Sequence, residues 1–211
     1  MKTLPYGVVV FLSLGVTAYA IVTYALLPLG AAVHPVMRAT FEAHRFATYM
    51  HIFGSAVALA LGPLQFSSWL RVKHLSLHRA TGRLYLGIGI LLGGVAGLYM
   101  AFHAFGGPFT RVGFACLAIL WLYSGLRAYL AIRAGDVAAH RRWMIRNFSL
   151  TFAAVTLRLW LPAAMLLRVP FEVAYPAIAW LCWVPNFFIA QILTRRAMTS
   201  TSSRASVLRD A

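Results

Sequence analysis

The stretch LHRATGRLYLGIGILLGGVAGLYMAF, residues 77–102, decides the fold class of this chain. It opens with a histidine and two arginines and then continues as an apolar segment. A bilayer core of about 30 Å needs about 20 apolar residues in a helix, and this segment is of that length. The cationic groups at its start either mark the cytoplasmic face of a membrane or hold a ligand.

Composition assigns the whole chain to a lipid environment. Apolar residues make up 61% of the 211 residues and charged residues 11%, whereas a soluble domain carries about 25% charged residues. Lys and Arg number 19 against 4 acids. They sit between apolar runs and follow membrane topology, which excludes a nucleic-acid-binding class. Cys116 and Cys182 lie alone in apolar runs, which predicts small core residues rather than a disulfide.

Six apolar runs predict an all-α integral membrane bundle of six transmembrane helices. We predict a single transmembrane domain over 1–194 and a disordered cytoplasmic tail over 195–211, which is polar and rich in Ser and Thr. AYA at 18–20 resembles a signal-peptide cleavage site, but the first run continues far enough to span, which indicates an uncleaved anchor. The predicted spans are 6–28, 48–70, 84–105, 112–133, 144–167 and 174–194.

The distribution of Lys and Arg predicts that both termini are cytoplasmic. Of the 19, fourteen lie in the termini and alternate loops of one side, among them Arg79, Arg83 and Arg141. The loops of the other side hold four, and Arg158 lies within the fifth run. The inner arginines are suited to anionic lipid headgroups, to haem propionates or to an anionic electron donor.

Four histidines fall at two depths of the predicted bundle. His51 and His103 lie near the outer ends of the second and third helices, and His78 and His140 lie just before the third and fifth runs on the inner side. Paired neutral imidazoles in a helical bundle are the arrangement of bis-histidine haem. We therefore predict one or two haem b sites, with His51 and His103 as the outer ligand pair and His78 and His140 as the inner pair. His78 and His103 are about 37 Å apart along a helix, so the inner pair is predicted at the headgroup level.

These histidines also have simpler interpretations. An outer-end imidazole can sit at the interface as an amphipathic ring. The inner pair, flanked by arginines, can bind phospholipid headgroups. His74 and His78 are four residues apart and could share a divalent metal, but two ligands without a nearby acid or cysteine make a poor zinc site.

Arg158 lies about 21 Å into the fifth helix, and no Asp or Glu lies within an apolar run. An intramembrane arginine indicates a functional site by default, and its partner has to be identified. The candidates are Glu42, Glu172, a backbone carbonyl or a ligand carboxylate such as a haem propionate. The other interpretation is that the side chain extends to the outer interface, roughly 9 Å away.

The third helix is rich in glycine, and small residues four apart let helix backbones approach closely in lipid. Packing alone explains this pattern, and the same close approach also makes room for a flat cofactor. Prolines predict local kinks, at Pro63, Pro162, Pro176 and Pro185.

Three segments resemble a known family: HIFGSAVALALGPLQF (51–66), LHRATGRLYLGIGILLGG (77–94) and DVAAHRRWMIRNFSLTFAAVTLRLWLP (136–162). Over roughly 48–165 the chain resembles the DUF2306 family of uncharacterised bacterial membrane proteins, which has no settled activity to carry over. More distantly, it is similar to cytochrome b561 and ferric-reductase-like bundles, which bind two b-type haems through histidines on central helices. That likeness implies the haem ligands His51, His78, His103 and His140.

Two functions of different class follow. The first is a membrane electron-transfer protein, a transmembrane oxidoreductase with one or two haems. Quinol, an ascorbate-like donor or ferric iron would be its redox partner. The second is a non-redox carrier or a lipid- or anion-binding protein, in which the His-Arg face binds anionic groups and Arg158 faces the pathway. A homodimer is compatible with either.

Overall fold

The structure, a computed structural model, describes residues 3–207 and contains no β-strand among them. Within this range 6 segments are long and apolar enough to cross a membrane, which confirms the all-α class and the six predicted spans. In chain order the helices are α1 (Thr3–Leu26), α2 (Pro35–Ala43), α3 (Arg45–Leu61), η1 (Pro63–Phe66), α4 (Ser68–Lys73), α5 (Leu75–Leu84), η2 (Tyr85–Leu92), α6 (Gly93–Phe102), α7 (Gly107–Arg133), α8 (Val137–Thr151), α9 (Ala153–Leu166), α10 (Phe171–Leu181) and α11 (Val184–Val207).

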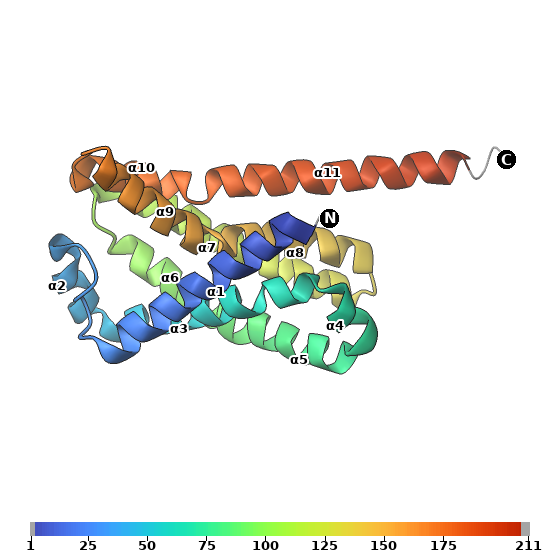
Figure 1. Cartoon of the computed structure of the whole chain (residues 1–211), viewed down its shortest axis with the longest axis horizontal. Coiled ribbons are helices and arrows are strands. Elements are labelled where there is room, and N and C mark those ends of the chain that lie inside the picture. Colours follow the sequence, from blue (N-terminus) through green and yellow to red (C-terminus); the bar gives the residue numbers. More distant parts are fainter. Residues whose placement is uncertain (1–2, 208–211) are drawn as a thin grey trace.

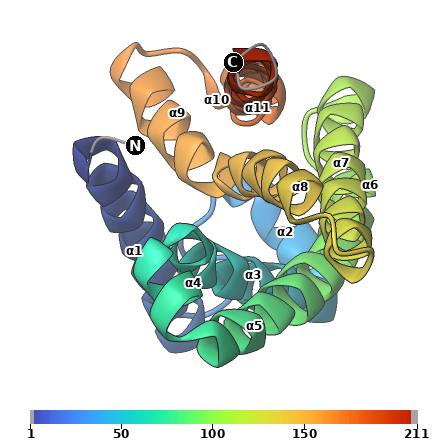
Figure 2. The same cartoon turned by 90° about the vertical axis from the view of Figure 1, so that its right-hand side faces the viewer.

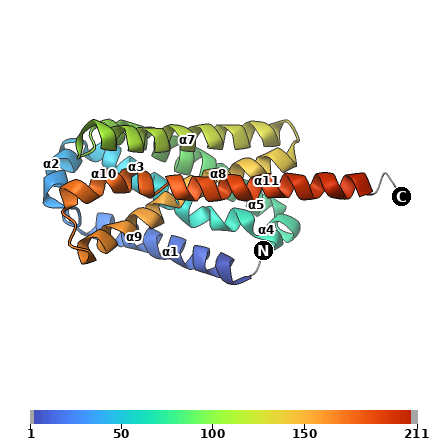
Figure 3. The same cartoon turned by 90° about the horizontal axis from the view of Figure 1, so that it is seen from above.

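The spanning segments run back and forth along one long axis (Figure 1). Helix α2 and the connections from α6 to α7 and from α9 to α10 lie at one end of the bundle, which we name the α2 end. Helix α4 and the connection from α7 to α8 lie at the other, the α4 end, and both ends of the described chain point that way (Figures 1 and 3). Viewed along the axis, α8 lies between α7 and α11 and contacts both (Figure 2).

The third and fifth spanning helices begin earlier than predicted. They run Leu75–Phe102 and Val137–Leu166, so the two His-Arg stretches form their first turns instead of preceding them. The Asp136 carboxylate caps the fifth helix by accepting a hydrogen bond from the Ala139 N–H over 2.8 Å, a common helix start. The second span ends earlier than predicted, at Phe66, and α4 follows as a separate helix.

Glycines bring the second and third spans into backbone contact. A Cβ built on Gly54 would lie 2.8 Å from the Cα atom of Gly93, and one built on Gly89 would lie 2.8 Å from the Cβ atom of Ala58. Backbone atoms cannot yield to a side chain at these distances, so the predicted small-residue packing of the third helix is confirmed. The same span winds as a π-helix over Tyr85–Leu92, a feature often found near functional sites.

The sixth span is interrupted at Cys182. Pro185 follows the interruption, has no N–H to donate and crowds the carbonyl four residues before it, so the predicted kink has its cause there. The carbonyl of Cys182, at the interruption itself, accepts hydrogen bonds from the Thr156 hydroxyl and, over 3.0 Å, from the Asn186 side-chain amide. Backbone groups in lipid must find such partners within the protein.

Helix α11 enters the segment 195–211, for which composition predicts a disordered tail. Residues 208–211 lie outside the described residues, and the disorder stays a prediction. Both cysteines are free thiols, with Cys182 buried and Cys116 half-buried, as predicted for small core residues.

Candidate functional site

A cavity of about 370 Å³ lies in the half of the bundle nearer the α2 end. Its walls are mainly apolar, so a few polar side chains define where the polar groups of a ligand can bind. Every spanning segment contributes to the wall, through residues such as Thr17, His51, Gly97, Phe114, Arg158 and Tyr175. The cavity is therefore a property of the whole bundle rather than of one helix pair.

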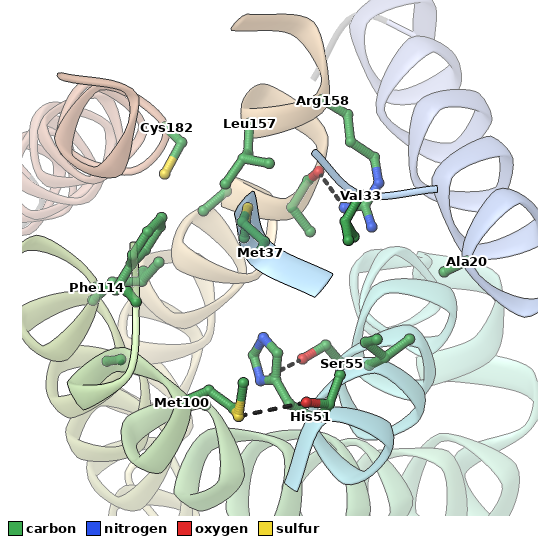
Figure 4. Close-up of a pocket in the computed structure, with 18 of the residues that line it drawn as sticks. Ala20, Val33, Met37, His51, Ser55, Met100, Phe114, Leu157, Arg158 and Cys182 are labelled. Atoms are coloured by element: carbon green, nitrogen blue, oxygen red, sulfur yellow. Dashed lines mark hydrogen bonds between the residues drawn. The ribbon is translucent and has the colours of Figure 1, made fainter. Parts of the chain in front are cut away.

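The connection between the first two spans covers this cavity. Val33 and Met37 extend over it, from the residues before α2 and from α2 itself (Figure 4). Pro35 occupies the first turn of α2, where a missing N–H costs nothing. The ring of His34 stacks on that of Phe171, with centroids 4.0 Å apart, which ties the cover to the start of α10.

His51 lies on the cavity wall against two glycines. Its Nδ1 lies 2.8 Å from the carbonyl oxygen of Gly93, and because a carbonyl only accepts, this nitrogen carries the proton. A Cβ on Gly97 would lie 2.6 Å from Nδ1, so only glycine leaves room for the ring. Nε2 keeps a lone pair, has no hydrogen-bond partner among the described residues and faces the cavity (Figure 4). An imidazole held in this way is oriented as a ligand.

Arg158 faces the cavity from the opposite wall, on α9 (Figure 4). Its Nη1 donates to the carbonyl oxygen of Ala154 over 2.9 Å, and its Cζ lies 5.4 Å from the centroid of the Tyr19 ring. In the part of the chain that the structure describes, no carboxylate pairs with this guanidinium, so neither Glu42 nor Glu172 is its partner. Of the predicted partners, the backbone carbonyl is found, and the charge itself stays unpaired within the described chain.

His103 also lines the cavity, but it contacts a different histidine from the one predicted. Its ring centroid lies 4.0 Å from that of His44, and its Nδ1 lies 3.0 Å from the carbonyl oxygen of Tyr99. His51 sits at the level of Gly97, about 9 Å of helix before His103. Their helices touch through glycine, and both histidines line the cavity, while a haem between them stays a prediction.

A buried polar network joins the third, fourth and fifth spans beside the cavity. Asn147 is fully satisfied: its Oδ1 accepts from the Tyr85 hydroxyl over 2.6 Å, and its Nδ2 donates to the Trp121 carbonyl over 2.7 Å and to Ser124 Oγ over 2.9 Å. The Thr151 hydroxyl accepts from the Trp121 indole over 2.8 Å. Asn147 thereby joins three helices, and in lipid such bonds hold helices together.

The same network joins the two helices that carry His78 and His140, which lie toward the α4 end. The third and fifth spans both run from the α4 end to the α2 end (Figure 1). Each histidine lies seven positions before a bonded partner, His78 before Tyr85 and His140 before Asn147. Seven residues are two turns, about 10 Å, and return to the same helix face.

The two inner imidazoles differ in their partners. His140 Nδ1 lies 2.8 Å from the carbonyl oxygen of Ala128, so Nδ1 carries the proton and Nε2 is free to bind a ligand. His78 Nδ1 is buried without a hydrogen-bond partner in the described chain, a state that costs about 1–3 kcal/mol. The ring of His74 rests against Trp69 instead, and no cluster of three metal-ligating side chains occurs among the described residues.

The predicted anion-binding arginines surround this inner pair. Arg79 and Arg141 each follow a histidine directly, Arg83 lies one turn further along α5, and all three side chains are exposed. Arg71 and Arg79 act electrostatically on His78. Carboxylate or phosphate groups at the membrane surface can therefore reach guanidinium groups next to both histidines.

Two residues that build these sites are not among those predicted, Tyr85 and Gly97. For Tyr85 the signal is the equal spacing of seven residues in the two His-Arg segments, His78 to Tyr85 and His140 to Asn147. Gly97 follows Gly93 by one turn on the face that meets α3, but sequence spacing alone does not say that it meets an imidazole.

Residues 48–194 match a family model described as a predicted membrane protein, DUF2306. The matched range begins in α3 and ends in α11, so it contains both inner histidines and the His51 and Arg158 sides of the cavity. No curated protein and no solved structure matches the chain.

Proposed function

The chain belongs to the DUF2306 family of predicted membrane proteins, and we propose that it is a multi-pass electron-transfer protein of the b-cytochrome type with a haem held between His78 and His140. The observation that carries the proposal is the register of the third and fifth spans. The Tyr85–Asn147 hydrogen bond joins parallel helices two turns beyond the two imidazoles. Neutral imidazoles on two facing helices are a bis-histidine ligand set.

The donor chemistry of this pair fits haem. The Ala128 carbonyl holds the protonated Nδ1 of His140, as a backbone carbonyl commonly does for a metal-ligating histidine, and so directs Nε2 outward. The Nδ1 of His78 is buried, which leaves Nε2 as the ring nitrogen that would face a haem iron. Arg79 and Arg141 offer planar forks for carboxylates of the propionate kind. Haem, when bound, supplies one-electron transfer, while these residues bind and orient it.

We propose one haem rather than two. A flat ring ligated by both His51 and His103 would have to lie between them, whereas their helices are in contact at Gly54 and Gly93 and the His103 ring packs on His44, with centroids 4.0 Å apart. The proposed haem lies at the α4 end, where Lys and Arg concentrate and which we expect to be cytoplasmic in a bacterial cytoplasmic membrane. A quinol, an ascorbate-like donor or ferric iron would exchange electrons there.

The proposal is tested by a dithionite-reduced minus oxidised absorption spectrum of the purified full chain, expressed with added haem, with haem quantified per chain. We expect a b-type band and one haem per chain. His78→Ala and His140→Ala should each lose the band. His74→Ala is the matched control, because it removes an imidazole at the same end of the bundle whose ring rests on Trp69, and it should keep the band.

A colourless, folded protein would overturn the redox proposal. A band that survives in both His78→Ala and His140→Ala and disappears in His51→Ala would move the haem to the cavity. Without haem, the second candidate function is a non-redox carrier or lipid- or anion-binding protein. The specific observation that favours it is Arg158, an unpaired cation in the wall of an apolar cavity.

A further inference from the structure

We propose that the cavity of the α2 half binds an amphipathic molecule with a single carboxylate head, which pairs with Arg158. This proposal does not depend on haem at the α4 end, because the cavity wall contains neither His78 nor His140. It assigns a ligand class to the side chains that the proposed haem leaves unused.

The proposal starts from the charge of Arg158, which no carboxylate of the described residues neutralises. A guanidinium at this depth of a bundle needs an anionic partner or a route to water. The chain has 4 acidic residues in total, and none of those in the described range pairs with Arg158. The ring of Tyr19 offers a cation–π contact at 5.4 Å, which attracts the cation without neutralising it. In our proposal a molecule bound in the cavity supplies the missing negative charge.

The donors of Arg158 show what kind of anion fits. Arginine has five N–H donors in a planar fork, and one of its two terminal nitrogens is occupied by the Ala154 carbonyl. The donors that remain suit the two oxygens of a carboxylate. One guanidinium balances one negative charge, whereas a phosphate carries up to two and would need further cations. The cavity has no lysine and no second arginine in its wall.

The lining of the rest of the cavity indicates that the carboxylate head is attached to an apolar chain. Its wall is apolar over most of its area and includes Phe114, Leu117 and Leu157. A volume of about 370 Å³ lies within the range of about 300–1,000 Å³ that small-molecule sites occupy. An aliphatic chain fits this lining because it needs no hydrogen bonds and gains from leaving water. His51 on the opposite wall presents only Nε2, which can bond a neutral group but carries no fixed charge.

The test uses the full chain in detergent, with oleate as the probe and methyl oleate as its uncharged counterpart, measured by displacement of a fluorescent fatty acid. We expect oleate to bind and methyl oleate to bind at least about tenfold more weakly, since a charge-assisted pair typically contributes a factor of this size. Arg158→Gln should weaken oleate binding by a similar factor. Equal binding of oleate and methyl oleate by the unmodified protein would overturn the proposal, and this comparison needs no variant.

The matched control is Arg111→Gln. Arg111 lies at the same end of the bundle and also donates to a backbone carbonyl, that of Ala104, but it is outside the cavity wall, so oleate affinity should not change. If Arg158→Gln fails to fold, Arg158→Lys keeps the charge without the fork and should bind oleate with intermediate affinity. An oleate affinity unchanged in both Arg158 variants would overturn the proposal.

The haem spectrum of the same samples separates the two proposals. Oleate binding by a colourless protein would overturn the electron-transfer proposal and support this one. Loss of the haem band in Arg158→Gln, in a protein that does not bind oleate, would show that the carboxylate beside Arg158 is a haem propionate and would overturn this one. A haem band unaffected by Arg158→Gln, together with weakened oleate binding, is the result that we expect.

Discussion

The hydroxyl of Tyr85 donates a hydrogen bond of 2.6 Å to the side-chain oxygen of Asn147, and both side chains are completely buried. This bond joins the third and fifth spanning helices, which are not neighbours in sequence. It also sets their register, because parallel helices joined at one level are level again two turns away. We therefore expect His78 and His140, each two turns before this bond, to lie at one level.

Replacing Tyr85 by Phe should lower the free energy of unfolding by about 1–2 kcal/mol. The change removes only the hydroxyl and leaves the Asn147 oxygen buried without its donor, which is the costly half of a broken hydrogen bond. The measurement is unfolding of the detergent-solubilised protein by heat or by SDS titration. We also expect weaker retention of haem, because the helices that carry the two imidazoles lose a bond that holds them in register.

Tyr49→Phe is the control for this experiment. Tyr49 stacks its ring on Phe53, with centroids 5.9 Å apart, and its hydroxyl has no hydrogen-bond partner among the described residues. The same atom is therefore removed without breaking a bond. Equal stability losses in the two variants would mean that the Tyr85–Asn147 bond does not stabilise the bundle.

Gly54→Ala should destabilise the bundle by about 1–3 kcal/mol, the usual cost of overpacking. Its methyl group would lie 2.8 Å from the Cα atom of Gly93 and 3.1 Å from the carbonyl oxygen of Ile88. These are backbone atoms, so the two helices themselves would have to move apart. Gly87→Ala is the matched control, since a Cβ there meets nothing within 4 Å. Similar melting temperatures for the two variants would contradict the close backbone contact.

The sequence is sufficient to predict the spans, because each is a long apolar run and lipid admits few alternatives to a helix. It misplaces the starts of the third and fifth helices. The His-Arg residues at 78–79 and 140–141 look like loop residues by composition, yet no proline or left-handed residue ends the helix there. Long arginine side chains reach water from the first turns of a helix. Helix α2 has no apolar run and cannot be recognised by hydropathy.

The sites are less predictable, because they depend on which helix faces meet. The depth of His51 and His103 in the bilayer suggests them as partners. Which side chains each of them contacts depends on the helix faces that meet, and depth does not give this. The His103 ring packs on His44, whereas the His51 ring packs against Gly97. For Arg158 the sequence indicates an intramembrane cation but not its neighbours, since the cavity forms only when all six spans pack together. The equal spacing from His78 to Tyr85 and from His140 to Asn147 is visible in the sequence. Only the Tyr85–Asn147 hydrogen bond in the structure shows that the two segments are neighbours.

The tautomer of His51 is a third prediction. Nδ1 should carry the proton because its partner, the Gly93 carbonyl at 2.8 Å, can only accept. Nitrogen-15 shifts of histidine-labelled protein distinguish the two tautomers. Gly97→Ala should shift the signals of His51, because the new methyl group would lie 2.6 Å from Nδ1 and displace the ring from Gly93. A His51 with its proton on Nε2 in the unmodified protein would contradict this geometry.

The orientation of the bundle is the last prediction, and it follows from charge. Helix α4, the connection from α7 to α8 and both ends of the described chain point to one end (Figure 1), and that end holds most of the 19 Lys and Arg residues. Short segments rich in Lys and Arg stay on the cytoplasmic side during insertion. A fluorescent protein that matures only in the cytoplasm should therefore be bright when fused after residue 211 or inserted at Gly135. The same insertion at Gly106, in the connection from α6 to α7, should be dark, while alkaline phosphatase inserted there should be active. The opposite pattern would mean that the bundle has the opposite orientation in the membrane and that the proposed haem lies at the outer face. Intact membrane insertion of each fusion, checked by extraction, is the control that makes a dark result meaningful.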